Sequence, residues 1–237
     1  MNDISSNLDE QIAYYKARAA EYDEWFERRG RYDHGEAHRV LWEKEADEVR
    51  RHLRRFAPKG NVLELAGGTG IWTTQLLQHA SCLTVVDASE EMLTLNRLRC
   101  QTQASDAGVT YHTSVENIFD WTPTERFDVI FFSFWLSHVP ETHFQAFWDS
   151  VRSMLSTGGR CFFIDSKLAP NALAKNHPHP DLEQETATRK LNDGREFSIV
   201  KRFYQPDELE RRLDAMGFSA QVGATGNFFI FGELGYS

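Results

Sequence analysis

The stretch from Val62 to Gly70 (VLELAGGTG) constrains the fold of this chain more than any other part of the sequence. It begins as an apolar run with the acid Glu64 near its end, and it continues with small residues and three glycines. This pattern predicts a buried strand that turns tightly into a helix beginning near Ile71 or Trp72. Glycine is needed in such a turn because a side chain would block the close approach of the backbone to a ligand.

Glycine turns of this kind bind either dinucleotides or S-adenosylmethionine, and Glu64 favours the second ligand. A carboxylate at the strand tip would repel a pyrophosphate, but it could help to hold the cationic methionine part of S-adenosylmethionine. A dinucleotide turn would also have a small third residue where this chain has Thr73. The alternative without a ligand is an ordinary strand-to-helix turn. We predict a cofactor site that includes Glu64, Ala66, Gly68, Gly70 and Trp72.

A second acid, Asp87, ends the next apolar run, which begins at Cys82. Asp87 lies seventeen residues after Gly70, close to the offset at which an acid meets ribose hydroxyls in strand–helix–strand nucleotide sites. One carboxylate can accept hydrogen bonds from both hydroxyls, so we predict a ribose contact there. The alternative is a helix cap, a role that suits Ser89 better. The cofactor site is predicted to extend to Ala88 and Met92.

Two later segments complete the predicted site. The segment after a third strand, expected over 109–113, should border the adenine ring, and the candidates are Ser114, Val115, Glu116 and Asn117. A fourth strand, 127–133, is apolar throughout like a central parallel strand, and Ser133 ends it. His138 follows its carboxyl end, where open α/β sheets bind ligands, and is a candidate base. A packed or capping histidine is the alternative.

Apolar runs typical of strands alternate along the chain with apolar stripes typical of helices, which predicts a single α/β domain. We expect a Rossmann-like sheet of seven strands, with the last strand antiparallel and helices on both faces. Residues 1–58 should form a lid of two helices, and residues 59–237 should form the core. Tyr14 and Tyr22 in the lid can each bury a ring and offer a hydroxyl to the cofactor, although simple packing on the sheet is the alternative. Helices are expected over 8–29, 36–56, 71–79, 89–104, 140–155 and 206–216, and further strands over 160–165 and 227–232.

A substrate region is predicted over 166–203. Residues 166–184 are polar and rich in proline, which indicates a long loop that shapes a site. The loop carries His177 and His179, and because no further metal ligands can be located, we expect these side chains in solvent.

A hairpin is predicted around Asn192-Asp193-Gly194. A three-residue loop with Gly194 in the left-handed region would pair Arg189 with Phe197 and place Arg189 and Lys201 on one apolar face. Two cations on such a face need an anionic partner. A two-residue loop would separate them and leave both as surface charges. From the hairpin pattern both alternatives are open.

The composition excludes several classes of partner. The 26 basic and 35 acidic residues give a net charge of -9, which argues against nucleic acid or an anionic membrane as the main partner. The three cysteines have neither a disulfide framework nor a metal-binding spacing. The amino terminus does not resemble a signal peptide, and no apolar run reaches membrane-spanning length. We expect a soluble, cytoplasmic monomer or homodimer without a metal.

The motifs VLELAGGTG, VVDAS and FDVIFF, together with the late antiparallel strand, resemble class I S-adenosylmethionine-dependent methyltransferases over Tyr14 to Phe231. Ala66 departs from the glycine that many members have, and no clear aspartate follows the third strand. A closer resemblance, carried by YYKARAAEYD, FWLSHVP and DGREFSIVK, is to phosphonate O-methyltransferases of the dehydrophos type.

This closer resemblance implies a helical lid, S-adenosylmethionine as cofactor, and methyl transfer to an oxygen of a small phosphonate or carboxylate. It also implies that Arg189 and Lys201 hold the anion, with Tyr32 as the nearest candidate for an assisting tyrosine. His138 would become the base if the acceptor were a neutral hydroxyl. The alternatives are a C- or N-methyltransferase for a less polar natural product and a protein that binds the cofactor without turnover.

Overall fold

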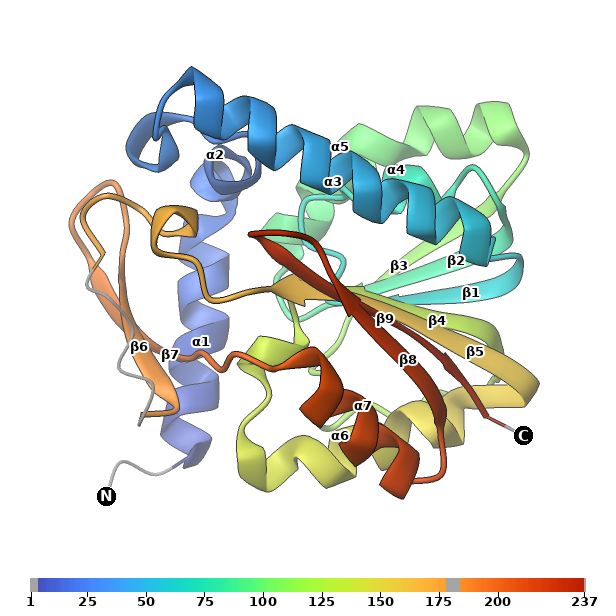
Figure 1. Ribbon diagram of the computed structural model, residues 1–237. Coiled ribbons are helices and arrows are strands. Elements are labelled where there is room, and N and C mark those ends of the chain that lie inside the picture. Colours follow the sequence, from blue (N-terminus) through green and yellow to red (C-terminus); the bar gives the residue numbers. More distant parts are fainter. Residues whose placement is uncertain (1–3, 178–183, 237) are drawn as a thin grey trace.

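The computed structural model describes residues 4–177 and 184–236, and its centre is a seven-stranded sheet with the order β3-β2-β1-β4-β5-β9-β8 (Figure 1). The strands are β1 (Gly60–Leu65), β2 (Ala80–Asp87), β3 (Thr110–Val115), β4 (Phe127–Ser133), β5 (Leu155–Ser166), β8 (Ser219–Ala224) and β9 (Phe229–Gly235). Neighbouring strands pair in parallel, except that β9 runs antiparallel to both β5 and β8. The predicted fold class is therefore confirmed.

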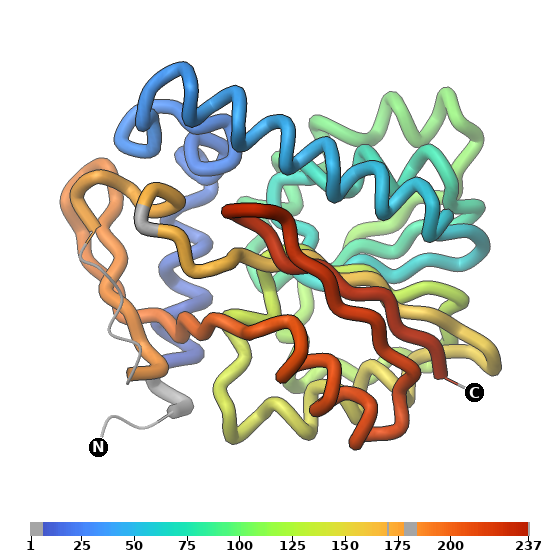
Figure 2. Tube along the Cα trace, in the orientation of Figure 1, coloured from blue at the N-terminus to red at the C-terminus, as the bar shows by residue number. Residues whose placement is uncertain are grey.

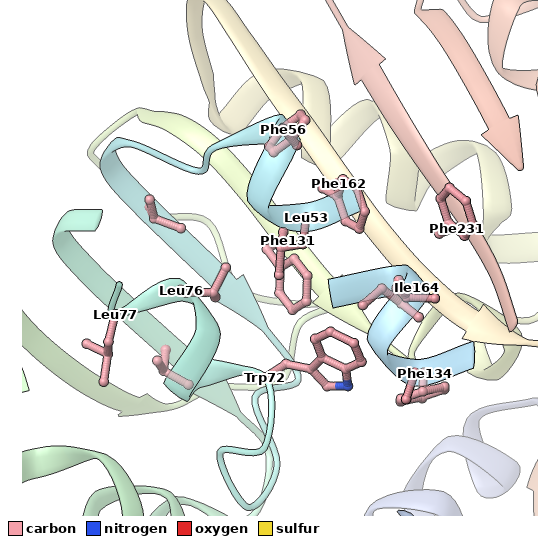
Figure 3. Close-up of a cluster of buried hydrophobic side chains, with 14 of the residues drawn as sticks. Leu53, Phe56, Trp72, Leu76, Leu77, Phe131, Phe134, Phe162, Ile164 and Phe231 are labelled. Atoms are coloured by element: carbon pink, nitrogen blue, oxygen red, sulfur yellow. The ribbon is translucent and has the colours of Figure 1, made fainter. Parts of the chain in front are cut away.

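Helices cover both faces of this sheet (Figure 1). One face carries α3 (Glu36–Phe56), α4 (Thr73–Leu76) and α5 (Glu90–Ala107), and the other carries α6 (Glu141–Met154) and α7 (Pro206–Ala215). Strand β4 is apolar because both of its faces are buried: Phe131 packs in the core under α3, and Phe132 packs in the core under α6. Figure 3 shows the first of these cores, where Leu53 of α3 lies beside Phe131 and Phe162.

A second, two-stranded sheet lies away from the main sheet, beside the amino-terminal helix α1 (Ile4–Arg18) (Figures 1 and 2). Its strands are β6 (Thr186–Lys190) and β7 (Glu196–Val200). The side chain of Gln11 links the two elements, because its Oε1 accepts from the backbone N–H of Val200 at 3.1 Å and its Nε2 donates to the carbonyl of His138 at 3.2 Å. Helix α1 and the hairpin thus meet the carboxyl side of the main sheet together.

The helix predicted over 8–29 is interrupted, which corrects one prediction. Helix α1 ends at Arg18, a 3₁₀ turn follows over Ala19–Glu21, and a short helix α2 covers Tyr22–Phe26. The interruption redirects the chain so that Trp25 packs edge-on against Trp42 of α3, with ring centroids 5.5 Å apart. A gain in aromatic packing thus accompanies the loss of helical continuity.

Several other boundaries differ from those predicted. The helix expected over 71–79 reduces to α4, because the flanking residues alternate between three- and four-residue backbone hydrogen bonds. Strand β5 begins at Leu155 and contains the two glycines at 158 and 159, whereas the strand predicted there covered only 160–165. Strand β8 is an additional strand for which no range was predicted, and the second hairpin strand, β7, ends at Val200, so Lys201 follows it.

Helix α3 belongs to the core under the sheet, whereas α1 packs on the hairpin. The division into a lid over 1–58 and a core over 59–237 stays a prediction. Among the described residues, no helix is both long and apolar enough to cross a membrane.

Replacing Glu45 by alanine should lower the free energy of unfolding by about 3 kcal/mol, because several buried donors would lose their acceptor. The Glu45 carboxylate ties α3 to the turn between β8 and β9 by accepting from Thr225 Oγ1, from the backbone and side-chain amides of Asn227, and from Phe228 N. Urea denaturation would measure the loss. The matched control is Glu43→Ala, whose half-exposed side chain bonds Arg50 and should contribute less than about 1 kcal/mol.

The Glu45 contact should also make stability depend on pH. Burial alone would raise the pKa of this carboxyl, but the hydrogen bonds from Thr225, Asn227 and Phe228 outweigh it and lower the pKa. The stabilisation is therefore present above the pKa of the unfolded chain and is lost as the pH falls through the lower folded pKa. Equal acid sensitivity of the wild type and Glu45→Ala would contradict this account.

Candidate active site

The first cavity lies at the carboxyl ends of β1, β2 and β4 and encloses about 690 Å³, its open mouth included. Helix α1 contributes to its wall through Leu8, Gln11, Ile12 and Tyr15. The residues predicted for the cofactor that line it are Tyr22, Ala66, Gly68, Asp87, Ala88, Met92, Asn117 and Ser133. The structure thus brings together eight predicted residues from five separate segments of the chain.

The glycine turn adopts the backbone conformation that its sequence predicts. Gly68 has a φ of +53°, and a side chain built on it would meet nothing within 4 Å, so its backbone borders open space. Gly67 is needed for packing instead, since a Cβ there would lie 2.2 Å from Val85 Cγ1. The backbone N–H groups of Gly68 and Ser89 each donate to the Asp87 carboxylate at 2.9 Å.

Two acids lie at this turn, of which Glu64 is buried and Asp87 is half-buried. Glu64 is 1% exposed and accepts from Thr73 Oγ1 at 2.6 Å through one carboxylate oxygen, while its other oxygen has no partner among the described residues. Burial raises the pKa of Glu64 to about 8 and that of Asp87 to about 6. Asp87 lines the cavity, whereas Glu64 lies beneath the turn, where a nearby cationic ligand would favour its ionised form. These residues therefore fit the methionine and ribose parts of S-adenosylmethionine.

Six residues predicted for the cofactor do not line this cavity, and one of them, Glu116, bonds Ser114 at the end of β3. Tyr14 is fully buried against the hairpin residues Leu191 and Ile199, and Val115 is 48% exposed at the end of β3. The remaining three are Glu64, beneath the turn, Gly70, which packs against Cys100 of α5, and Trp72, which lines a smaller neighbouring pocket.

Strand β3 runs two residues further than predicted, and its end determines which of the adenine candidates can reach the cavity. Ser114 and Val115 are strand residues, and the Glu116 carboxylate accepts from Ser114 Oγ at 2.6 Å. Asn117 is the candidate that lines the first cavity, followed by Ile118 and Phe119, which sequence reasoning missed. The cofactor contacts proposed for Tyr14, Val115 and Glu116 stay predictions without support from their positions.

A second cavity of about 620 Å³ adjoins the first. It is lined by the four residues predicted for catalysis and substrate binding, namely Tyr32, His138, Arg189 and Lys201. The two cavities share the wall residues Tyr15, Tyr22, Phe134 and His138. Phe134 follows β4 with a φ of +54°, an uncommon conformation for a bulky residue that is often associated with functional sites.

The hairpin has the three-residue loop, which decides between the two alternatives for its cations. Arg189 pairs with Phe197 across the strands, and Gly194 has a φ of +93°. Arg189 and Lys201 consequently reach the same cavity, and Arg189 is only 6% exposed. The one hydrogen bond of its side chain to the described residues runs from Nη1 to the carbonyl of Thr188 at 3.1 Å.

Lys201 lies at the base of the second cavity. Its Nζ donates to Ser137 Oγ at 2.7 Å and lies 3.7 Å from a carboxylate oxygen of Asp165. Burial lowers the pKa of Lys201 to about 8; Arg189 adds to this shift, and Asp165 opposes it. The ammonium group is therefore cationic at neutral pH but close to losing its proton.

The ring of His138 is engaged on both sides. Its Nδ1 lies 2.6 Å from the carbonyl of Val200, which can only accept, so Nδ1 carries the proton. Nε2 is therefore an acceptor and receives the hydroxyl proton of Tyr15 at 2.7 Å. Burial, with Lys201 nearby, lowers the pKa of His138 well below its usual range. Direct proton abstraction by this imidazole would require Tyr15 to move.

Sequence reasoning missed three residues of the second cavity. Arg18 and Tyr15 stand in the YYKAR motif, but the cavity that they line is completed by Tyr22 and Tyr32, which follow an end of α1 that the periodicity did not indicate. His177 was expected in solvent, yet it lines the cavity and its ring packs edge-on against Tyr32 at 6.3 Å. His179 lies outside the described residues.

A family model described as a methyltransferase domain matches residues 37–221. The chain belongs to this family, and it is an S-adenosylmethionine-dependent methyltransferase. It is similar to DhpI, the dehydrophos methyltransferase, at 35% identity. The complex of DhpI with SAH covers 96% of each chain with a TM-score of 0.73. The complex with SAM and HEP covers 96% of this chain and 97% of that one, with a TM-score of 0.75.

More distant structures share the fold. A methyltransferase from Clostridium acetobutylicum, at 17% identity, covers 94% of this chain and 99% of its own length with a TM-score of 0.63. No curated protein matches the chain.

Proposed function

We propose that this methyltransferase transfers the methyl group to an oxygen of a small anionic acceptor, either a phosphonate or a carboxylate. The observation that supports this most strongly is the buried guanidinium of Arg189, which faces the second cavity and pairs with no carboxylate among the described residues. A buried cation of this kind is costly unless a ligand supplies the opposite charge. The resemblance to DhpI, whose complex with SAM and HEP is similar to this chain, points in the same direction.

The proposed chemistry is an in-line displacement. The cofactor supplies an electrophilic methyl group; the acceptor oxygen forms the new O–C bond as the C–S bond breaks, and the sulfur keeps the electron pair. An anionic oxygen is already deprotonated and needs no base, so the protein has mainly to align the acceptor and exclude water. Arg189 and Lys201 would hold the anion, and Tyr32 would orient it at the wall shared by the two cavities.

Because an ionised acceptor needs no base, the reaction can proceed while both nitrogens of His138 are hydrogen-bonded. The imidazole fixes the Tyr15 hydroxyl through Nε2, and Tyr15 and His138 both belong to the shared wall. A neutral hydroxyl acceptor would need a base instead, and His138 offers no free nitrogen while it holds Tyr15 and Val200. The geometry therefore favours an acceptor that arrives ionised.

The experiment that tests the proposed function is a panel of small phosphonates, carboxylates, alcohols and amines, incubated with the enzyme and cofactor labelled in the methyl group. Label transfer to phosphonates or carboxylates is the expected result. Transfer only to amines, alcohols or carbon acceptors would overturn the proposal. Cofactor binding without transfer to any acceptor would indicate a protein that holds the cofactor without turnover.

The value of kcat/KM for the acceptor should fall as the pH rises through about 8, because the free enzyme loses the proton of Lys201 there. An acceptor that keeps its charge across the pH range isolates this effect. Lys201→Arg should move the fall to higher pH, since arginine stays protonated. The matched control is Lys190→Arg on the same hairpin, where Lys190 is partly exposed and pairs with Glu196. An unchanged profile in Lys201→Arg would show that another group controls the fall.

A further inference from the structure

Arg18 is a third cation at the second cavity. The sequence motifs and the hairpin pattern assign no role to this residue. It is 7% exposed, and its Nη2 donates to the Tyr32 hydroxyl at 3.1 Å. Its guanidinium lies 4.9 Å from the ring centroid of Tyr22, and its Nε has no hydrogen-bond partner among the described residues. No Asp or Glu of the described chain forms an ion pair with it. Arg18 therefore carries an unbalanced charge into the cavity.

The charged side chains around the second cavity indicate how much negative charge a ligand must carry. Arg18, Arg189 and Lys201 line it, the two arginines being buried and the lysine side chain 9% exposed, while its described wall contains no Asp or Glu. Asp165 lies behind Lys201 and offsets one of the three cations. A fourth cation, Lys167, donates to the carbonyls of Thr225 and Gly226 at a partly exposed position, where water can solvate it. Two buried positive charges are thus left for a ligand to balance.

We infer that Arg18 is an anion-binding residue of the second cavity and that, with Arg189 and Lys201, it selects acceptors carrying two negative charges over singly charged ones. This inference rests on the proposed function and narrows it. A phosphonate dianion or a dicarboxylate meets the requirement, whereas a simple monocarboxylate does not.

The charge of the product differs from that of the acceptor. Methylation of a phosphonate oxygen forms an O–C bond and removes one negative charge, so a doubly charged acceptor becomes a singly charged monoester. Two unbalanced cations of the cavity hold the doubly charged acceptor, and they bind the singly charged monoester less tightly. The enzyme should therefore release the monoester readily and should not methylate it a second time.

The test compares ions that differ in charge but do not titrate near neutral pH. Sulfate is a tetrahedral dianion, and methyl sulfate is its singly charged ester, so the pair imitates the acceptor and its product. Calorimetric titration uses the full chain saturated with S-adenosylhomocysteine, at constant ionic strength. Succinate against its monomethyl ester then shows whether a dicarboxylate is also preferred. Methylphosphonate, whose second proton titrates near neutral pH, is compared with its monomethyl ester at several pH values. The wild type should bind sulfate on the order of tenfold or more tightly than methyl sulfate.

Arg18→Met should weaken sulfate binding by roughly tenfold and methyl sulfate binding much less, so the preference falls towards one. The matched control is Arg29→Met, which removes an exposed cation of the same amino-terminal segment that pairs with Glu27. Tyr32→Phe removes the hydroxyl that Arg18 contacts but leaves the cation in place, so it should keep the preference even where both ions bind more weakly.

The outcomes are distinguishable from those of the proposed function. Equal binding of sulfate and methyl sulfate by an enzyme that methylates phosphonates or monocarboxylates overturns this inference and leaves the proposed function standing. A preference that survives in Arg18→Met, or that disappears equally in Tyr32→Phe, also overturns it and identifies Arg18 as a support for the tyrosines. An enzyme that binds neither ion and methylates no anionic acceptor refutes the proposed function itself.

Discussion

Replacing Arg189 by methionine should reduce kcat/KM for the anionic acceptor by roughly a hundredfold to a thousandfold, while cofactor affinity stays almost unchanged. The guanidinium lies in the second cavity, is 6% exposed, and has a single carbonyl partner among the described residues. Burial lowers its pKa from the usual arginine value, which is the direction expected for a cation that lacks an opposite charge. The acceptor would supply that charge, so its binding and alignment should depend on this side chain.

The hairpin itself provides the control for this experiment. Arg195 stands in the same hairpin, but its side chain is more than half exposed and pairs with Asp193 across the turn. Arg195→Met removes the same charge without touching the cavity, so kcat/KM should change by less than about threefold. Calorimetry with S-adenosylhomocysteine confirms that each variant is folded. Full activity of Arg189→Met towards the best acceptor would favour a less polar acceptor and contradict the assignment of this cavity.

Replacing Asp87 by alanine should weaken cofactor binding by roughly a hundredfold, since the half-buried carboxylate that we propose accepts from the ligand hydroxyls would be lost. Asp87 lines the first cavity and already accepts from the backbone of Gly68 and Ser89, so it also holds the glycine turn in place. Titration with S-adenosylhomocysteine measures the effect. Glu90→Gln is the control, because this exposed carboxylate begins the next helix and pairs with Arg97.

The stability of Asp87→Asn separates a binding role from a structural one. Burial raises the pKa of Asp87 to about 6, so the folded chain holds this proton more tightly than the unfolded chain. The resulting stabilisation is present at low pH and is lost as the pH rises through about 6. Near neutral pH the ionised carboxylate therefore lowers stability, and Asp87→Asn without ligand should unfold at the same or a higher temperature. A large loss of stability together with unchanged cofactor affinity would identify Asp87 as a structural residue.

The cofactor turn was predictable because its requirements are local. A strand buried on both faces must be apolar, and a backbone that borders a ligand must lack a side chain, so Val62 to Gly70 carries both requirements in nine consecutive positions. The same locality holds for Asp87, which ends the adjacent strand β2. Other residues that line the cavity, such as Ile12, Ile118 and Phe134, come from elements far apart in the sequence. No local pattern specifies where those elements meet.

The substrate cavity shows where sequence reasoning stopped. The pattern around Gly194 was compatible with two loop lengths, and a change of one residue moves every side chain of a strand to the other face. The structure has the loop that brings Arg189 to Lys201. Arg18 could not be assigned because its contacts, Tyr22 and Tyr32, follow the interruption after α1. There the chain loses helical hydrogen bonds and gains the aromatic packing of Trp25 on Trp42.

The central claim is that the methyl group goes to an oxygen of an anionic acceptor. The most direct measurement uses a cofactor whose methyl carbon is carbon-13 and identifies the labelled product of the best phosphonate by nuclear magnetic resonance. We predict a single labelled methyl ester whose carbon couples to phosphorus through one oxygen, and no diester. A labelled methyl group bonded to carbon or nitrogen, or on an oxygen remote from the phosphonate group, would contradict the account.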